Sequence, residues 1–482
     1  MRGDATFVGQ PRGLATLFFT EMWERFTYYG MRSVLILFLV GAVSTGGLGF
    51  DDQTASSIYG LYICATYIFS LLGGWIADRL IGPQRAVIAG SVLIFAGNAL
   101  LAVSQREVFF VGLLVIVLGV GLLKPNISVM VAQLYPEGGS RRDAGFSIFY
   151  TGISVGAVLG SFLVSLCAAR YGWRAGFTLP AIGMLLGLGY FLLTRQHLVE
   201  SDIVVPRDVK AWLPVIILVL AIATLAGLAF AGRITIDPAA VSSAASWLLG
   251  LLAAGYFIYL LVFAGLAAAE RRRVYVMMVL FVAYAIFYAG FEQGGASMNL
   301  FAERYVDRQL FGWSFPAGIL QGTTAFYTIL LAPAFAALWL ALGKRGKDLS
   351  PPAKFATGLA LLSVGTLVMV VPSESVAAGH RVLPVWLLVT YLLQECGDLC
   401  LSPVGLSSMT KLAPPRYVSQ VMGVWFLALG LGNNLAGQLS REYDSTNLDS
   451  LPALFLKIFW WTLGAAIVLY GLSPRLARLM QN

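Results

Sequence analysis

The chain has 482 residues, of which 58% are hydrophobic and 12% charged, and its mean hydropathy is +0.80. These values lie far outside the range of soluble globular proteins and indicate a membrane protein with many spans. The formal net charge of +8 is typical of some nucleic-acid binders, but the basic residues cluster in alternate loops between apolar runs. The charge therefore reflects membrane topology, and we expect no nucleic-acid partner.

The apolar runs predict the secondary structure in chain order. A membrane-spanning helix needs about 20 apolar residues, so we predict an all-α polytopic membrane protein with about 14 transmembrane helices. The runs cover approximately 14–41, 56–80, 85–103, 108–135, 142–169, 175–194, 211–231, 243–268, 274–298, 316–342, 354–372, 383–411, 417–438 and 453–473.

The loops between these runs predict the orientation. Lys and Arg gather in alternate connections, such as 195–210 and 343–354, whereas the opposite connections, such as 41–55, carry few. The positive-inside rule then places both termini in the cytoplasm, in an inner membrane of bacterial type. The polar segment 1–13 leads directly into a full-length span, so we expect no cleavable signal.

The first run contains four charged residues in "TEMWERFTYYGMRS", residues 20–33. An ionised side chain at the bilayer centre costs roughly 2.5–3.5 kcal/mol on insertion scales. Spacings of three or four residues place these charges on one face of the helix, together with an aromatic residue. We therefore expect this face to avoid lipid and to line the protein interior; its residues are Glu21, Glu24, Arg25, Tyr28 and Arg32.

The order of the runs predicts the domain organisation. Six spans precede the polar stretch 195–210, two spans without intramembrane charge follow within 211–268, and six further spans complete the chain. We expect an N-terminal six-helix bundle, an inserted hairpin outside the functional core, and a C-terminal six-helix bundle, with the substrate near the midplane between the bundles. The three regions are 14–194, 195–272 and 273–474.

The second run ends in "GGWIADRLIGPQR", residues 73–85. We expect its glycines to allow close approach to a neighbouring helix. Asp78, Arg79 and Arg85 stand at the cytoplasmic edge, where a charge network can stabilise one conformation. The segment resembles the G-x-x-x-D-R motif of the major facilitator superfamily, which implies a gating role for the three residues.

Other polar residues lie in or near spans. Lys124, Glu292, Glu395 and Asp398 lie deep in apolar runs, so they must pair or line a water-filled cavity. Lys457 lies near the start of the last run, and we expect it to reach the membrane interface. We expect the cysteines to be packed thiols that form neither a disulfide nor a metal site; they are Cys64, Cys167, Cys396 and Cys400. The two histidines, His197 and His380, fall in loops, so no histidine is available for proton transfer inside a span.

Several stretches in chain order, among them "ERFTYYG", "GLLKPNIS", "FYTGIS", "FEQGG" and "GDLCLSPVGLS", resemble the signatures of the proton-dependent oligopeptide transporter family. The resemblance runs from about residue 14 to the last core span. It implies a major facilitator fold and proton-coupled symport of di- and tripeptides by alternating access. It also implies that proton coupling depends on Glu21, Glu24, Arg25, Arg32 and Glu292. Arg32 is the expected partner of Glu292.

The resemblance further implies a peptide site and its gate. Arg25 and Lys124 would bind the peptide carboxylate, and Lys124 would meet Asp398 across the cytoplasmic side of the cavity. The residues implied in substrate binding are Arg25, Tyr28, Tyr29, Tyr67, Lys124, Ser154, Tyr288, Thr324, Glu395, Asp398, Ser402 and Trp425.

Four positions depart from the family pattern on the side of the peptide amine. Ser154 and Thr324 stand where the family usually has Asn, and Asp398 stands where it has Glu. Glu395, one turn before Asp398, has no counterpart in the usual motif. We expect the shorter groups to hold the amine, in part through water, with Glu395 as an additional ligand.

Two other functions stay open at this point. The first is a proton-coupled symporter of another small solute, such as nitrate or an amine, because the family includes members that no longer carry peptides. The second is a membrane enzyme, but the sequence has no H-E-x-x-H, no G-x-S-x-G and no Cys/His ligand set. We therefore expect no enzyme, no cofactor and no metal, with the proton gradient as the driving force. Peptides, protons and the lipid bilayer are the expected partners, with no obligate protein partner.

Overall fold

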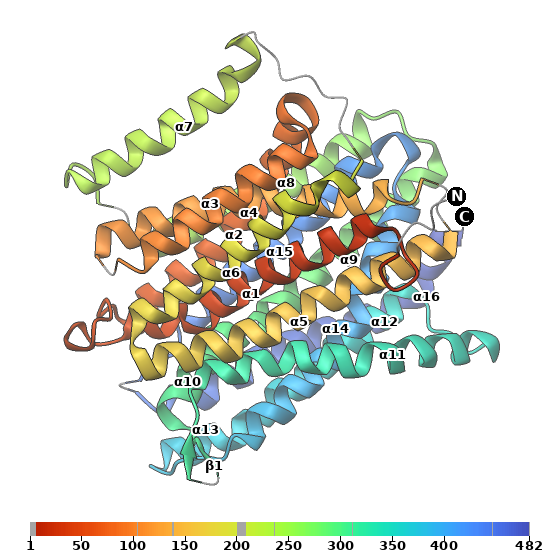
Figure 1. Ribbon diagram of the computed structural model, residues 1–482. Helices are drawn as coiled ribbons and strands as arrows, with labels where there is room; N and C mark the ends of the chain where they lie inside the picture. The colour runs from red at the N-terminus through yellow and green to blue at the C-terminus, as the bar shows by residue number, and fades with distance from the viewer. Residues whose placement is uncertain are drawn as a thin grey trace. The chain divides into compact units, whose positions relative to one another are not determined.

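The computed structural model describes residues 6–103, 105–136, 139–199, 209–235, 237–310, 312–445 and 447–481. Long α-helices make up nearly all of this part of the chain (Figure 1). Twelve helices of the described residues are long and apolar enough to cross a membrane. The prediction of an all-helical polytopic membrane protein is therefore confirmed.

Packing divides the chain into two compact units. The first unit contains Met1–Val34, Val43–Leu48 and Ala65–Val241. Its elements are most of α1 (Arg12–Val40), η1 (Val43–Thr45), the end of α2 (Asp52–Ile76), η2 (Ala77–Ile81), α3 (Pro83–Leu101), α4 (Arg106–Gln133), α5 (Gly139–Tyr171), α6 (Trp173–Thr194), η3 (Arg195–His197) and α7 (Val209–Phe230).

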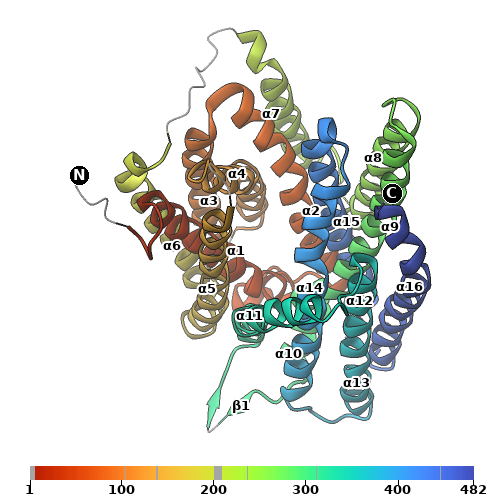
Figure 2. The same ribbon diagram turned by 90° about the vertical axis from the view of Figure 1, so that its right-hand side faces the viewer.

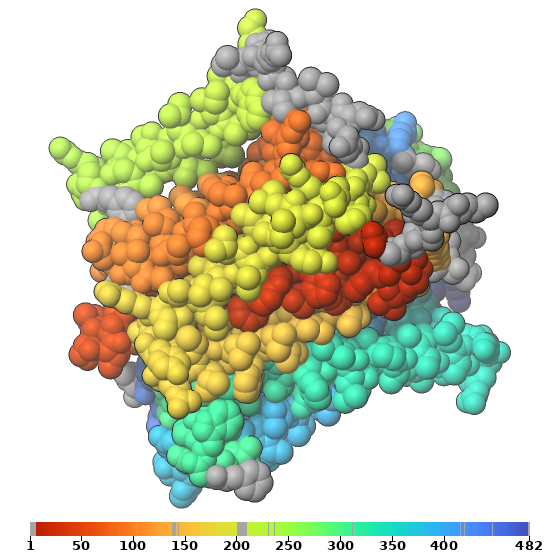
Figure 3. All heavy atoms as spheres, in the orientation of Figure 1, coloured from red at the N-terminus to blue at the C-terminus, as the bar shows by residue number. Residues whose placement is uncertain are grey.

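Within the first unit, α3 packs along α4 and α6, and α5 packs along α6. Figure 3 shows α5, α6 and the beginning of α1 side by side on one face. The helix α7 differs from these helices, because none of its apolar window Lys210–Ala229 is buried. Its Leu, Ile and Val side chains are therefore suited to contact with lipid.

The second unit contains Leu35–Ala42, Gly49–Cys64 and Ser242–Asn482. In it, α12 packs against α14 and α16, and α9 packs against α15 (Figure 2). Its elements are most of α8 (Pro238–Val262), α9 (Ala268–Phe291), η4 (Glu292–Gly295), α10 (Ser297–Tyr305), β1 (Gln309–Leu310), β2 (Trp313–Ser314), η5 (Ala317–Gln321), α11 (Gly322–Lys344), α12 (Pro351–Val368), α13 (Val370–Ala377), α14 (Val385–Leu412), η6 (Pro415–Tyr417), α15 (Val418–Ser440) and α16 (Ser450–Gln481).

The antiparallel strands β1 and β2 pair Gln309 with Ser314 and Leu310 with Trp313. The turn between them includes Gly312 at φ +80°, a backbone conformation that favours glycine. This short hairpin lies between two apolar helices and was not predicted from the sequence.

The predicted run 274–298 is not a continuous helix. Its α-helix α9 ends at Phe291, and Glu292 begins the 3₁₀ segment η4. Gly294 and Gly295 follow Glu292 and disfavour a regular helix, because glycine loses more conformational entropy than other residues when it becomes helical. Glu292 therefore lies at a break between α9 and α10.

Two further helices, α1 and α15, fall outside the twelve apolar spans. Both are long enough to cross a membrane, with 29 and 23 residues. The charged residues of α1 lower its hydropathy, whereas α15 carries several amide side chains, Gln420, Asn433, Asn434 and Gln438.

The helix α8 is held to α15 by hydrogen bonds that are buried or partly buried. Asn434 Nδ2 donates to the carbonyl of Ser242 at 2.6 Å and contacts Ser246 Oγ at 2.8 Å. Gln438 Nε2 donates to the same carbonyl at 3.0 Å. The predicted inserted helix at 243–268 thus contacts α15 through polar side chains and not through apolar packing alone.

Candidate functional site

The charged face of α1 forms a compact cluster in the first unit. Arg25 Nε lies 3.1 Å from Glu21 Oε1 and donates a second hydrogen bond to Glu24 Oε2. The exposed fractions of the three side chains are only 3%, 1% and 4% for Glu21, Glu24 and Arg25. Charges this deeply buried are stable only when they are paired, so the cluster behaves as one electrostatic unit.

This cluster retains unused hydrogen-bonding capacity. Among the described residues, Glu21 Oε2, Glu24 Oε1 and Arg25 Nη2 are buried without a hydrogen-bond partner. Buried polar atoms without partners are uncommon because each costs the desolvation of that atom. The cluster therefore presents one donor and two acceptors that the protein itself does not satisfy.

Three cations of the first unit, Arg25, Arg32 and Lys124, each lie near a tyrosine ring. The Arg25 guanidinium carbon lies 5.0 Å from the centre of the Tyr28 ring, and that of Arg32 lies 5.8 Å from Tyr29. Lys124 Nζ lies 4.3 Å from the centre of the Tyr67 ring. Distances within about 6 Å give favourable cation–π attraction. The structure thus brings each predicted tyrosine of this unit to a predicted cation.

A second polar cluster lies in the second unit, around Asp398 on α14. Tyr288 donates a hydrogen bond to Asp398 Oδ1 at 3.1 Å, and Ser402 donates another to the same oxygen. Tyr284 lies 3.4 Å from Ser402 Oγ, and its ring stacks on Trp425 at a centroid distance of 4.1 Å. Four of the predicted site residues, Tyr288, Asp398, Ser402 and Trp425, are therefore neighbours.

Glu395 is turned to a different partner. Its Oε1 lies 2.6 Å from the hydroxyl oxygen of Thr328 on α11, within hydrogen-bond distance, and its exposed fraction is 3%. Thr324, one turn before Thr328, donates its hydroxyl hydrogen to the carbonyl of Gln321 at 2.9 Å. Glu292 is also buried, at the break after α9.

The remaining predicted residues are placed as follows. Ser154 is half-buried on α5. The three predicted gate residues, Asp78, Arg79 and Arg85, are exposed. They lie in η2 and at the start of α3, and in this described segment they form no ion pair with one another. The pairings of Arg32 with Glu292 and of Lys124 with Asp398 stay predictions.

Residues outside the predicted site also have defined positions. Lys457 is half exposed and pairs with Glu442. His197 is the last residue of η3, and His380 follows α13 in a loop. Cys64 and Cys400 are buried, and Cys167 and Cys396 are half-buried.

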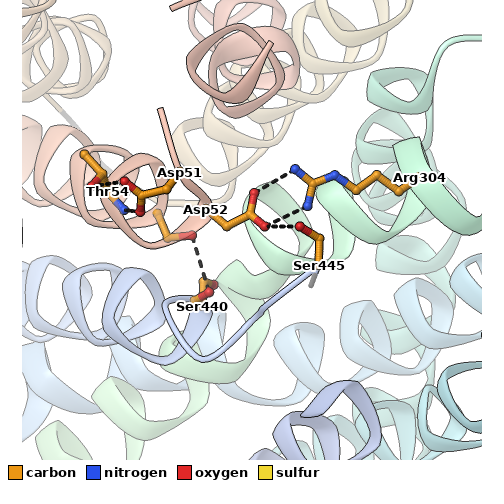
Figure 4. A network of polar contacts seen from close by, with 7 residues as sticks. Asp51, Asp52, Thr54, Arg304, Ser440 and Ser445 are labelled. Carbon is orange, nitrogen blue, oxygen red and sulfur yellow. Dashed lines mark hydrogen bonds and ion pairs between the residues drawn. The ribbon is translucent and has the colours of Figure 1, made fainter. Parts of the chain in front are cut away.

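The sequence analysis missed a network around Asp52, the first residue of α2 (Figure 4). Arg304 at the end of α10 donates two hydrogen bonds to the Asp52 carboxylate, at 2.7 and 2.8 Å. Ser445 donates a third, at 2.9 Å. The available signal was an acidic pair, Asp51 and Asp52, in a loop with few cations, and an arginine at the end of an apolar run.

Known proteins resemble the chain over its whole length. The sequence profile of the POT family matches residues 84–454. The peptide transporter YePEPT of Yersinia enterocolitica is 39% identical over 498 aligned residues, which cover 100% of the chain and 97% of YePEPT. The chain belongs to the POT family. The predicted family is thereby confirmed.

Two further proteins support this assignment. A di-/tripeptide transporter of Lactococcus lactis is 35% identical over 456 residues, which cover 92% of the chain and 91% of that transporter. A crystal structure of a mutant peptide transporter POT in complex with alafosfalin is 38% identical with a TM-score of 0.90, and the match covers 99% of the chain and 98% of that protein. The chain is a membrane transporter with the POT fold and is not an enzyme.

Proposed function

We propose that the chain imports di- and tripeptides together with protons across a bacterial inner membrane. The observation that carries this proposal is the cluster of Glu21, Glu24 and Arg25, which is buried and yet offers an unpaired donor and two unpaired acceptors. A peptide carboxylate is an acceptor suited to Arg25 Nη2. Protonation of a carboxylate weakens its pairing with Arg25, so proton binding and peptide binding are linked in one cluster.

The second unit supplies the groups for the other end of the peptide. Asp398 is held by Tyr288 and Ser402, and an anionic oxygen in this position suits a peptide ammonium group. The stacked rings of Tyr284 and Trp425 add apolar surface beside it. In this proposal a peptide is read by its two charged ends, which predicts tolerance of many side chains.

The transport cycle follows from the predicted organisation. We place α1 and α15 in the membrane together with the twelve apolar helices, so that two six-helix bundles, 14–194 and 273–474, alternate access to a site near the midplane. The region 195–272, with its two extra helices, lies outside these bundles. Both termini are cytoplasmic, and Asp78, Arg79, Arg85 and the pair of Lys124 with Asp398 stabilise the closed cytoplasmic side.

Uptake by the purified protein in liposomes tests the substrate. With an imposed inward proton gradient, labelled dialanine should accumulate, whereas free alanine and nitrate should not. The same gradient with a protonophore is the control, because it removes only the driving force. Accumulation of nitrate or of an amine without uptake of dialanine would instead support the other small-solute function.

Coupling is tested at Glu292, the buried carboxylate at the break after α9. Glu292→Gln cannot bind or release a proton there, so it should lose uphill accumulation of dialanine while retaining counterflow between peptide-loaded liposomes and the medium. Uphill uptake that survives this substitution would remove Glu292 from the proton path.

A further inference from the structure

Glu395 belongs to no pairing in the proposed cycle, and its surroundings are unusual. The side chain has an exposed fraction of 3%. The contact recorded for its carboxyl group in the described structure is a neutral hydroxyl, that of Thr328, at 2.6 Å. No ion pair of Glu395 occurs within the described residues, and the charged group one turn away is Asp398. An ionised carboxylate in this position would be buried beside another anion without a cation.

The hydrogen atoms around Thr328 can be counted. Its Oγ1 lies within hydrogen-bond distance of two oxygens, Glu395 Oε1 at 2.6 Å and the carbonyl of Thr324 at 3.1 Å. A threonine hydroxyl has one hydrogen, and a carbonyl oxygen can only accept. If the hydroxyl hydrogen is donated to Thr324, the hydrogen between Thr328 and Glu395 must belong to the carboxyl group. Both contacts are satisfied together only when Glu395 is protonated.

The surroundings of Asp398 differ from those of Glu395. Tyr288 and Ser402 both lie within hydrogen-bond distance of Asp398 Oδ1, Tyr288 lies 3.2 Å from Ser402, and Tyr284 lies 3.4 Å from Ser402. Three hydroxyl groups thus share four contacts, and two of them can donate to one oxygen of Asp398. The inference of an acid hydrogen is therefore drawn for Glu395 alone.

The titratable neighbours do not alter this count. On α14 itself the neighbours are Cys396 and Asp398; Tyr288 on α9 and Glu292 at the start of η4 face Asp398. On α12, Lys354 pairs with Asp348 at 2.8 Å and lies over the Trp339 ring. On α11, the Tyr327 hydroxyl donates to the carbonyl of Leu388 at 3.3 Å.

The two helices that hold this contact each contain an internal proline, Pro333 in α11 and Pro403 in α14. Proline removes a backbone hydrogen bond and permits bending at that point. Bending of either helix changes the separation of Thr328 from Glu395 and the access of the carboxyl group to water. A proton held here can therefore be released in one conformation and bound in another.

We propose that Glu395 is an additional proton-binding group of this transporter, which donates its acid hydrogen to Thr328 Oγ1 in the conformation described and releases it during transport. The release is an acid dissociation: the O–H bond breaks, the electron pair stays on the carboxylate, and water accepts the proton. The inference rests on the proposed proton coupling, but the protonation state can be measured without transport.

Infrared spectroscopy of the reconstituted full-length protein at neutral pH tests the protonation state. The wild type should show the carbonyl band of a protonated carboxyl group, and this band should be absent in Glu395→Gln. The bands of ionised carboxylates should be the same in the two proteins. Thr328→Val should shift the band, because it removes the hydrogen-bond acceptor. Asp398→Asn, the matched carboxyl control, should retain the band. Loss of a carboxylate band in Glu395→Gln, in place of the protonated band, overturns the proposal.

The limiting accumulation of dialanine in liposomes tests release during transport. At static head this ratio depends on the number of coupled protons and not on affinity or rate. For a gradient of one pH unit, loss of one coupled proton should lower the ratio about tenfold in Glu395→Gln. A protonated band with an unchanged ratio overturns the proposal, since the proton would then stay in place. If the wild type accumulates no peptide, the proposed function fails, while the infrared result still decides the protonation state.

Discussion

At the scale of single residues, Arg25 is the side chain whose loss should be most harmful. Its Nε contacts both Glu21 and Glu24 in a buried site. Arg25→Ala leaves two buried carboxylates without this partner, and removal of one member of a buried ion pair typically costs about 3–5 kcal/mol. We expect a large fall in the thermal unfolding midpoint of the purified protein.

A neutral variant separates stability from function at this cluster. Replacement of Glu21 and Glu24 by Gln together with Arg25→Met removes all three charges, and such replacements are often neutral or stabilising. This variant should recover most of the unfolding midpoint and still fail to accumulate dialanine. Uphill transport by the neutral variant would show that the cluster serves packing alone.

Asp51 is a residue whose contribution should depend on pH. Burial alone disfavours its ionised form, but hydrogen bonds from the Thr54 amide and hydroxyl outweigh this effect and hold the pKa of Asp51 below its ordinary value. As the N-cap of α2 it should contribute about 0.5–2 kcal/mol relative to alanine. A lowered pKa in the folded protein means that this stabilisation is present at neutral pH and is lost as the pH falls through the folded-state pKa.

The measurement is the unfolding midpoint of wild type and Asp51→Ala across a pH series. The difference between them should be largest at neutral pH and should shrink below the unfolded value of about 3.9. Asp51→Asn is the control, because it keeps a capping oxygen without a titrating group. A difference that does not change with pH would rule out the ionised cap.

Individual charges were predictable from the sequence, whereas their partners were not. The spacing of Glu21, Glu24 and Arg25 along one helix is local, so their shared face follows from helical geometry. The place of Glu395 near the peptide amine stays a prediction, whereas its contact with Thr328, which is 67 residues away in the sequence, was not predicted. The register between two helices depends on packing over their whole length, and no local pattern encodes it.

At the scale of helices, close packing in the first unit depends on Gly73. A Cβ atom at this position would lie 2.0 Å from the carbonyl oxygen of Gly121 on α4. The predicted close approach at this motif is thereby confirmed. Gly73→Ala must push α2 and α4 apart, and overpacking of this kind typically costs about 1–3 kcal/mol.

The neighbouring glycine supplies a matched control. A Cβ atom on Gly74 would lie 3.9 Å from its nearest neighbour, Pro125 Cβ, which is an ordinary contact. Gly74→Ala should therefore leave the unfolding midpoint close to that of the wild type, whereas Gly73→Ala should lower it by several degrees. Equal effects of the two substitutions would contradict a specific contact between Gly73 and Gly121.

The positions of the helices were predicted well from hydropathy, whereas the breaks within them were not. The runs at 85–103 and 175–194 correspond closely to α3 and α6. The break at Glu292 lies inside the predicted run 274–298, because apolar residues continue on both sides of it. The break follows from Gly294 and Gly295, a local signal that an average over about 20 residues does not detect.

At the scale of the whole molecule, the two packing units do not follow the chain. Segments 35–42 and 49–64 come from the first two helices, yet they pack in the second unit with residues 242–482. The internal symmetry of the sequence assigns these segments to the N-terminal bundle. In the alternating-access cycle that we propose, these segments leave the second unit in the opposite conformation, and the contacts that hold them there would then stabilise one state of the transporter.

The contact of Asp52 with Arg304 is the strongest candidate for such a state-specific bond. The pair is bidentate and partly buried, with side-chain exposures of 11% and 27% for Asp52 and Arg304 (Figure 4). Hydrogen bonds to charged groups contribute about 1.5–3 kcal/mol, so Asp52→Asn should raise the population of the opposite conformation about tenfold or more.

Spin labels can be placed in a cysteine-free background at two exposed positions, Val43 in η1 and Leu383 in the loop before α14. The distance distribution between them reports this population. Asp52→Asn should enlarge the population with the longer distance, and adding Arg304→Gln should have little further effect, because both substitutions remove the same bond. The control is Glu303→Gln, which breaks a more exposed ion pair, that of Glu303 with Arg308, within the second unit. Two results would contradict the proposed role of the bond: an equal shift in the Glu303→Gln control, or additive shifts for the substitutions of Asp52 and Arg304. The bond would then not discriminate between the conformations, because a contact kept in both states cannot move their equilibrium.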